Sequence, residues 1–311
     1  MKIGIPHALL YFWYGRQWTE FWRGCGCEVI VSPPTDRAMV HAGAAVALDE
    51  LCLPMKIFIG HLITLQPLVD RIMIPHLIQV EPQAFICPKF MGLPDIIAHT
   101  APEAAARAVI VQVGPQQGTD QQRALAAAAR RLGLKPARLA GWDAAGGGDI
   151  PALQELAAAQ KQSRLRGKPS ITLGLLGHPY CLYDPCFNLD LLRFLARSQV
   201  RFLTPEQMPR EYHGIGSGQL QKKLFWTIGR SQLDALYWML EQKETPVDGF
   251  IHVAPFACGL EAMIGDLTAR RIKRAGLPLL QLNFEEHSGE AGVITRLEAF
   301  LDLIKFRSMV C

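Results

Sequence analysis

The sequence lacks the patterns of membrane, secreted and nucleic-acid-binding proteins. No run reaches about 18 uncharged apolar residues, the length that spans a bilayer. Lysine and arginine form no basic stripe with interleaved aromatics, and the formal net charge of +4 over 311 residues is small. The N-terminal stretch carries Lys2, His7 and Arg16 and has no small-residue cleavage site. We therefore expect a cytoplasmic protein with no membrane and no nucleic-acid partner.

Two further patterns are missing, and each absence narrows the chemistry. No glycine-rich phosphate loop is identifiable, so any ATP-dependent step is expected to belong to a separate protein. The eight cysteines do not follow the compact C-x₂-C spacing of zinc fingers and ferredoxins. A chain of this size needs no disulfides to fold, and a reducing compartment favours metal or redox roles for its thiols.

What the sequence does contain is an alternation of strand and helix patterns in both halves, with 50% hydrophobic residues. This predicts an α/β fold with two doubly wound (flavodoxin- or Rossmann-like) parallel-sheet domains, over residues 1–148 and 149–311, joined at Asp143–Asp149. The closing helix over 291–306 could pack back on the first domain. The expected strands are Lys2–Pro6, Cys27–Ser32, Arg71–Pro75, Val109–Val113, Ser170–Leu176, Arg201–Thr204, Gly249–Ala254 and Pro278–Asn283. The expected helices are Leu9–Arg23, Asp36–Ala47, one after Cys52, Thr119–Leu132 capped by Thr119, Ile150–Leu165, Asn188–Ser198, Gln219–Gln242, Leu260–Ala275 and Ala291–Phe306.

Three cysteines stand where helices are expected to begin. Pro54 lies two places after Cys52, Pro88 directly follows Cys87, and Cys258 ends a β-rich run before a helical pattern. Unpaired backbone N–H groups and the positive end of the helix dipole favour a thiolate at such positions, and thiolates bind soft metals. The spacings of 35 and 171 residues are a weak signal, because each cysteine is equally readable as an ordinary buried residue.

The loop GHPYCLYDPC gathers further reactive groups after the strand expected at Ser170–Leu176. Its polar side chains could position or protonate a bound oxygen or thioester, although a loop stiffened by Pro179 and Pro185 also explains them. The candidate catalytic residues are His178, Tyr180, Tyr183 and Asp184. Cys181 and Cys186 in the same loop are candidates for additional metal ligands or for small packed residues.

Several other polar residues are interpreted as structural. His61 is expected to be a satisfied core histidine, and Ser288 is expected to cap the final helix. Lys56 and Lys89, near Cys52 and Cys87, are read as solvated charges at helix starts; donation to the sulfide of a cluster is the alternative.

Six phrases carry a resemblance that covers nearly the whole chain: SPPTDR, ALDELCLPMKIFIGH, ICPKFMGLPD, GHPYCLYDP, HVAPFACGLEAM and EEHSGEAGVITRLEAFLDL. In this order they resemble the 2-hydroxyacyl-CoA dehydratase D-component family. More narrowly, they resemble the acyl-CoA dehydratase activase-related domain that large activases carry toward the C-terminus.

The resemblance implies one [4Fe-4S] cluster held by Cys52, Cys87 and Cys258 in a cleft between two flavodoxin-like domains. It implies low-potential reductive or dehydration chemistry on an acyl-CoA or another small substrate in anaerobic metabolism, with a separate ATP-dependent activator protein. The enzyme would be a dehydratase-like lyase, or a reductase with an [8Fe-9S] double-cubane cluster. Cys181 and Cys186 depart from the family pattern, and a fourth ligand from this pair would instead make the protein an electron-transfer partner with a closed cluster. A non-catalytic paralogue that only binds an activase remains open, as does a homodimer.

Overall fold

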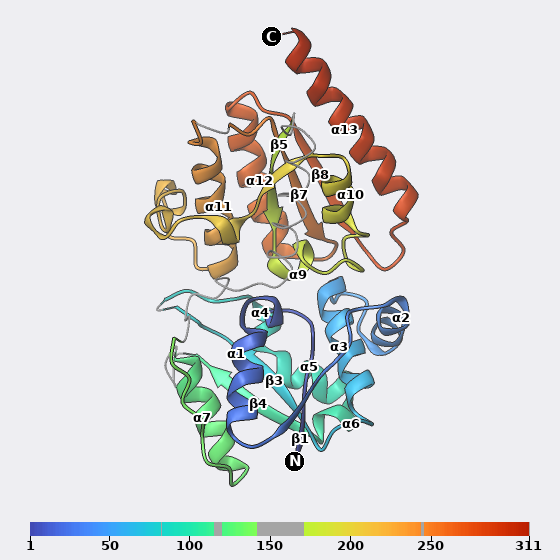
Figure 1. Cartoon of the computed structure of the whole chain (residues 1–311), viewed down its shortest axis with the longest axis vertical. Coiled ribbons are helices and arrows are strands. Elements are labelled where there is room, and N and C mark those ends of the chain that lie inside the picture. The colour runs from blue at the N-terminus through green and yellow to red at the C-terminus, as the bar shows by residue number, and fades with distance from the viewer. Residues whose placement is uncertain (82, 115–119, 142–170, 244–245, 311) are drawn as a thin grey trace. The chain divides into compact units, whose positions relative to one another are not determined.

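The structure is a computed structural model that describes residues 1–81, 83–114, 120–141, 171–243 and 246–310. The chain divides into two compact units, residues 1–149 with 225–227 and residues 150–224 with 228–311. Each unit is built around its own sheet (Figure 1). The joint expected at Asp143–Asp149 and the helix expected over Ile150–Leu165 lie outside the described residues.

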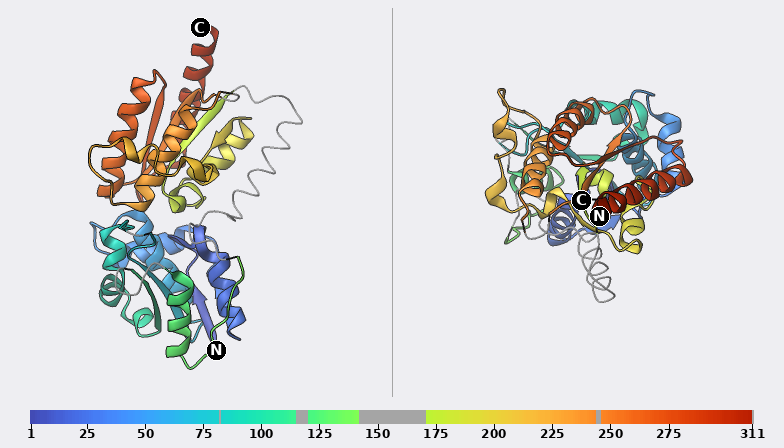
Figure 2. Two further views of the ribbon diagram at one scale, coloured as in Figure 1. Left: turned by 90° about the vertical axis from the view of Figure 1, so that its left-hand side faces the viewer. Right: turned by 90° about the horizontal axis from the view of Figure 1, so that it is seen from above.

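The first unit contains a four-stranded parallel sheet in the order β2-β1-β3-β4. Its strands are β1 (Lys2–Ile5), β2 (Glu28–Val31), β3 (Arg71–Leu77) and β4 (Ala108–Val113). Helices lie on both faces of this sheet (Figure 2). They are α1 (Tyr11–Gly24), α2 (Arg37–Val46), α3 (Leu53–Leu65), α4 (Pro88–Met91), α5 (Leu93–Thr100), α6 (Pro102–Ala105) and α7 (Gln121–Arg131).

Local sequence signals account for the starts of several of these helices. Asp36 caps α2 by accepting a hydrogen bond from the Met39 N–H at 2.8 Å, and Asp120 caps α7 by accepting one from the Arg123 N–H at 3.0 Å. The prediction that Thr119 caps α7 was therefore wrong; Thr119 itself lies outside the described residues. Proline stands in the first turn of α3, α4, α5 and α6, where its missing N–H costs no helical hydrogen bond.

The second unit repeats the same topology with the strand order β6-β5-β7-β8, again all parallel. Its strands are β5 (Thr172–Gly177), β6 (Arg201–Leu203), β7 (Gly249–Pro255) and β8 (Leu279–Phe284). Its helices are α9 (Pro179–Leu182), α10 (Leu191–Arg197), α11 (Thr227–Leu240), α12 (Gly259–Arg274) and α13 (Glu290–Val310), with 3₁₀ turns at Pro205–Gln207, Arg210–Tyr212 and Ser217–Gln219. All seven residues of β7 are buried, as expected for a central parallel strand covered on both faces.

The fold class predicted from the sequence is confirmed, because each sheet is parallel and flanked by helices. Both sheets also reverse their strand order once, between β1 and β3 in the first unit and between β5 and β7 in the second. Doubly wound sheets bind ligands outside the carboxyl ends of the strands at such switch points. This rule directs attention to the residues that follow β5 and β7.

One long helix begins later than its sequence pattern predicted. The prediction placed a helix over Gln219–Gln242, but α11 begins at Thr227. The residues before it are extended, because Phe85 N–H donates to the Phe225 carbonyl at 2.6 Å and Thr227 N–H donates to the Phe85 carbonyl at 2.8 Å. Pairing with a distant segment has overridden local helix propensity here.

Aromatic side chains of α1 contribute to the core of the first unit. Trp18, Phe21 and Trp22 from α1 are buried, and the Trp22 indole N–H lies 3.2 Å from the Met73 sulfur of β3. In the second unit α11 supplies Leu236 and Met239 to a cluster around Phe250 of β7. Among the described residues, no helix is long and apolar enough to cross a membrane.

Candidate functional site

Cys52 and Cys87 occupy equivalent positions at the starts of two helices in the first unit. Cys52 is the N-cap of α3 and Cys87 is the N-cap of α4, and both have extended backbone conformations. The Cys52 carbonyl accepts from the Met55 N–H at 2.9 Å, and the Cys87 carbonyl accepts from the Phe90 N–H at 3.1 Å. The helix starts predicted from the two cysteine–proline patterns are therefore confirmed.

Two opposing effects act on the protonation of these two thiols. Burial raises the pKa of Cys52, and it raises the pKa of Cys87 to about 11. Backbone N–H groups and the Lys89 ammonium lower both pKa values, but desolvation is the larger effect. The helix starts thus favour the thiolate form of Cys52 and Cys87, as expected, while burial opposes it.

The same electrostatics shows that Cys52 and Cys87 share one neighbourhood. A charge on Cys52 raises the pKa of the Cys87 thiol, and Lys89, two residues after Cys87, lowers the pKa of Cys52. The Lys89 ammonium also donates to the Glu50 carbonyl at 2.8 Å, just ahead of Cys52. Residues 35 positions apart in the sequence are thus brought together by the fold.

Lys56 and Lys89 bring positive charge to this neighbourhood. The prediction described both as solvated, but Lys56 on α3 is buried with 5% of its surface exposed. Its charge, like that of Lys89, favours the thiolate of Cys52. A buried ammonium beside a thiol stabilises negative charge more strongly than a solvated one.

Cys258 belongs to the second unit and follows the switch-point strand β7. It is the half-buried N-cap of α12, and the residue before it, Ala257, has a left-handed conformation with φ of 60°. Non-glycine residues adopt this conformation at a cost, which turns the chain sharply between strand and helix. The helix start predicted for Cys258 is confirmed.

The four candidate catalytic residues lie just after β5, and all are buried. His178 is the N-cap of α9, and its ring centroid lies 5.0 Å from that of Tyr180. The Tyr183 hydroxyl contacts Thr204 Oγ1 at 2.8 Å and also the Glu206 carboxylate. Burial and then the Glu206 charge raise the pKa of Tyr183 well above its ordinary value. The Tyr183 hydroxyl is therefore held between Thr204 and Glu206 in its neutral form.

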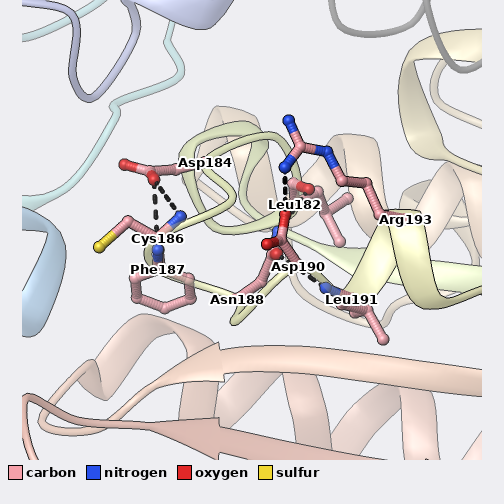
Figure 3. A network of polar contacts seen from close by, with 8 residues as sticks. All are labelled: Leu182, Asp184, Cys186, Phe187, Asn188, Asp190, Leu191 and Arg193. Carbon is pink, nitrogen blue, oxygen red and sulfur yellow. Dashed lines mark hydrogen bonds and ion pairs between the residues drawn. The ribbon is translucent and has the colours of Figure 1, made fainter. Parts of the chain in front are cut away.

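Asp184 organises the loop that follows α9, as Figure 3 shows. One carboxylate oxygen accepts from the backbone N–H of Cys186 at 2.9 Å and of Phe187 at 3.2 Å. The Asn188 amide donates to the Leu182 carbonyl at 2.7 Å, and its oxygen accepts from the Leu191 N–H at 3.1 Å. The role that these bonds give Asp184 is to shape the loop.

The two additional cysteines of this loop differ in exposure. Cys181 on α9 is completely buried, whereas Cys186 is half-buried and its sulfur points away from the network around Asp184 (Figure 3). Only the half-buried thiol is partly accessible to solvent.

Sequence reasoning missed a buried polar cluster beside His178. Glu261, on the first turn of α12, lies with Oε2 at 2.6 Å from His178 Nε2 and with Oε1 at 2.6 Å from His252 Nε2 of β7. Gln232 of α11 donates from Nε2 to Glu261 Oε2 at 3.1 Å. The available signal was a histidine inside an apolar strand and a glutamate nine residues later, at the start of the next helix.

Glu261 is a buried carboxylate that remains ionised. Burial alone would raise the pKa of Glu261, but its close polar contacts with His178 and His252 together hold it well below its usual range. The Glu261 side chain has no exposed surface, so these neighbours replace its hydration. The carboxylate is thereby fixed as an acceptor for the two imidazoles.

Of the two residues interpreted as structural, His61 has the predicted role and Ser288 does not. His61 is fully buried between Ser32 and Thr35, which confirms its assignment to the core. The Ser288 hydroxyl accepts from the Glu285 N–H at 2.9 Å, upstream of α13, so the prediction that it caps that helix was wrong. Within the described ranges, no group of three or more His, Cys, Asp or Glu side chains is positioned to hold a metal ion.

The chain contains two α/β units in tandem, each with a parallel sheet and with polar groups near its switch point. The protein is therefore a doubly wound α/β protein, a class that binds ligands at such switch points. A family model described as CoA enzyme activase uncharacterised domain (DUF2229) matches residues 2–208, about two thirds of the chain. The chain belongs to this family. The match supports the activase-related part of the resemblance and does not specify a dehydratase D-component. No curated protein matches the sequence.

Proposed function

We propose that the protein is an iron–sulfur member of this activase-related family, in which Cys52, Cys87 and Cys258 bind a [4Fe-4S]-type cluster. The observation that supports this most directly is the convergence of Cys52 and Cys87 at two helix starts in the first unit. Both are followed by backbone N–H groups, and two lysines offset negative charge at Cys52. Thiolate ligands carry negative charge, which such surroundings stabilise.

The residues fit a soft-metal group in part. Two thiols in one neighbourhood are a suitable beginning of a cluster-binding set, since Fe–S clusters are held by cysteine thiolates. A complete set requires further donors, because the described residues contain no ready group of three. Cys258, at the start of α12 after β7, has the same local setting and would be the third ligand.

The proposed activity is low-potential reductive or dehydration chemistry that uses a separate ATP-dependent activator. When bound, the cluster would supply electrons at low potential, and an iron without a fourth cysteine would be open to an oxygen atom of the substrate. The substrate class is an acyl-CoA or another small molecule. His178, Tyr180 and the backbone around Asp184 would provide the polar surroundings of that substrate.

Anaerobic purification followed by iron and sulfide analysis tests the proposal. We expect a brown protein with about four irons per chain, or about eight if two cubanes are joined as in [8Fe-9S], and a cubane-type electron paramagnetic resonance signal after reduction. Colourless protein with stoichiometric zinc, before and after anaerobic reconstitution with iron and sulfide, would exclude the cluster.

A further inference from the structure

The polar cluster around Glu261 contains three buried atoms that lack hydrogen-bond partners in the described part of the chain. They are His178 Nδ1, His178 Nε2 and Gln232 Oε1, and of these His178 Nε2 has an ion-pair contact with Glu261. Both side chains contact the same carboxylate oxygen, Glu261 Oε2, through His178 Nε2 at 2.6 Å and Gln232 Nε2 at 3.1 Å. Leaving a buried polar atom unpaired destabilises the folded protein, so His178 Nδ1 and Gln232 Oε1, which have no ion-pair contact either, indicate a missing partner.

The carboxylate determines what kind of partner is missing. The His178 Nε2 contact with Glu261 is an ion-pair contact rather than a well-angled hydrogen bond, and it favours a proton on Nε2. Nδ1 then presents a lone pair. Gln232 likewise uses its N–H group on Glu261 and presents its carbonyl oxygen. Each of these two acceptors calls for a donor.

The position of the cluster suits a ligand site. His178 directly follows β5, and Leu176 of β5 pairs with His252 of β7, so the cluster stands beside the β5–β7 switch point. We propose that His178 Nδ1 and Gln232 Oε1 bind the O–H group of a small hydroxyl-bearing ligand or of a water molecule, and that Glu261 and His252 are positioning residues that orient His178 toward it.

The surroundings of His178 support a proton-transfer role in this site. The ionisable groups around it are Glu261 from α12 and His252 from β7, while α9 adds the Tyr180 ring and α11 the neutral amide of Gln232. If the bound O–H bond breaks, its proton moves to Nδ1, its electron pair stays on the oxygen, and Glu261 compensates the imidazolium. A carboxylate behind an imidazole provides orientation and charge compensation together.

His252 is held tightly enough to fix the carboxylate. It donates from Nε2 to Glu261 Oε1 at 2.6 Å, and a Cβ atom at Gly265 would lie 2.6 Å from its Cε1 atom. The absence of a side chain at Gly265 therefore allows the ring to lie against α12. His252 thus fixes Glu261 through Oε1, and Oε2 contacts His178 and Gln232.

Nuclear magnetic resonance of iron-free protein labelled with [¹⁵N]histidine tests the proposal independently of any cluster. We expect His178 to carry its proton on Nε2. We also expect either a cross-peak between the His178 ring and a bound water, or a change in the ¹⁵N chemical shift of Nδ1 that saturates as methanol is added. Acetonitrile, which is of similar size and has no O–H group, is the control probe. Displacement of the water by methanol identifies a ligand hydroxyl, and a water that methanol does not displace identifies water as the bound group.

The proposal is overturned if His178 carries its proton on Nδ1, or if neither bound water nor a methanol response is found. Glu261→Gln should allow both tautomers of His178, whereas Glu290→Gln, at an exposed glutamate in the first turn of α13, should leave the wild-type tautomer. Gln232→Met keeps the side-chain length and should weaken methanol or water binding about tenfold through the loss of one hydrogen bond. A folded Glu261→Gln variant that keeps the wild-type tautomer would remove the positioning role.

Discussion

His61 illustrates how burial decides the chemistry of a single residue. Its ring nitrogens contact Ser32 Oγ at 2.8 Å and Thr35 Oγ1 at 3.0 Å, and it has no exposed surface. Burial, with a smaller effect of the nearby His7, lowers the pKa of His61 to about 3. Burial also lowers the pKa of His7 to about 4. Both imidazoles are therefore neutral in the folded protein at any pH above these values.

We predict that this pair makes the first unit sensitive to mild acid. Below pH 6.5 these histidines take up protons in the unfolded chain but not in the folded chain. The free energy of unfolding therefore decreases as the pH is lowered, until the pKa of the folded state is reached. For His61 alone the loss between pH 7 and pH 5 is about 2 kcal/mol. Urea unfolding at several pH values measures it.

A His61→Gln variant provides the comparison. It should be less stable at pH 7, because two hydrogen bonds are disturbed, but its stability should fall less steeply between pH 7 and pH 5. His41→Gln, at an exposed position on α2, is the matched control and should follow the wild-type curve. Equal slopes for all three proteins would contradict the prediction.

The sequence predicted the positions of the candidate site residues better than it predicted their protonation and their buried partners. Proline next to cysteine correctly indicated that Cys52 and Cys87 begin helices. Their protonation could not be read from the sequence, because desolvation depends on residues that tertiary packing brings around them. Glu261 was missed for a similar reason: it resembles an ordinary first-turn glutamate until His178 and His252 are placed beside it.

At the scale of elements, α2 and α3 approach each other at two glycines. A Cβ atom at Gly43 would lie 1.8 Å from the Lys56 carbonyl oxygen, and one at Gly60 would lie 2.0 Å from the Met39 carbonyl oxygen. Backbone atoms cannot move aside as a flexible side chain can. The close packing of these two helices therefore requires both glycines, and it positions the helix that begins after Cys52.

We predict that Gly60→Ala destabilises the protein by about 3 kcal/mol, because α2 and α3 would have to separate. Gly292→Ala in α13 is the control, since nothing lies within 4 Å of the added Cβ atom. That substitution should stabilise the protein by roughly 0.5–1 kcal/mol through better helix propensity. Chemical unfolding of both variants measures the difference, and a Gly60→Ala variant as stable as wild type would show that the helices can shift at little cost.

Long periodic elements were predictable and short ones were not. Within the described residues, the expected strands and long helices recur within a few residues of their observed bounds, with the later start of α11 as the largest difference. The short helices α5 and α6 went unrecognised because segments of four to eight residues show too little periodicity, and α4 was indicated only by the proline that follows Cys87. Their prolines at the first turn were the remaining signal.

For the whole molecule, the proposed ligand set leads to a clear mutational ranking. Alanine at Cys52, Cys87 or Cys258 should each remove nearly all bound iron, because each substitution deletes one thiolate ligand. Alanine at Cys25, whose sulfur accepts a hydrogen bond from the Ala137 N–H at 3.3 Å, should leave iron content nearly unchanged. Iron analysis of anaerobically purified variants measures this.

The same series distinguishes the roles of the remaining loop cysteines. Retention of iron with an altered reduction potential in Cys181→Ala or Cys186→Ala would mark residues near the cluster rather than required ligands. Unchanged iron content and spectrum in Cys52→Ala would show that the ligand assignment is wrong.

Alternation of strands and helices was sufficient to predict two parallel sheets, since right-handed crossovers leave few other arrangements. It was not sufficient to show that both sheets share one strand order. That order depends on which strands pair, and in parallel sheets pairing joins segments far apart in the sequence.

The segment Phe225–Thr227 belongs to the first unit although it lies far along the chain, and this limits where the protein can be divided into fragments. A fragment that ended at residue 149 would lack the segment that pairs with Phe85, and would leave backbone donors and acceptors open to other chains. The two units are therefore not interchangeable cassettes joined end to end. Fragment complementation or domain exchange with this protein must carry residues 225–227 along with the first unit.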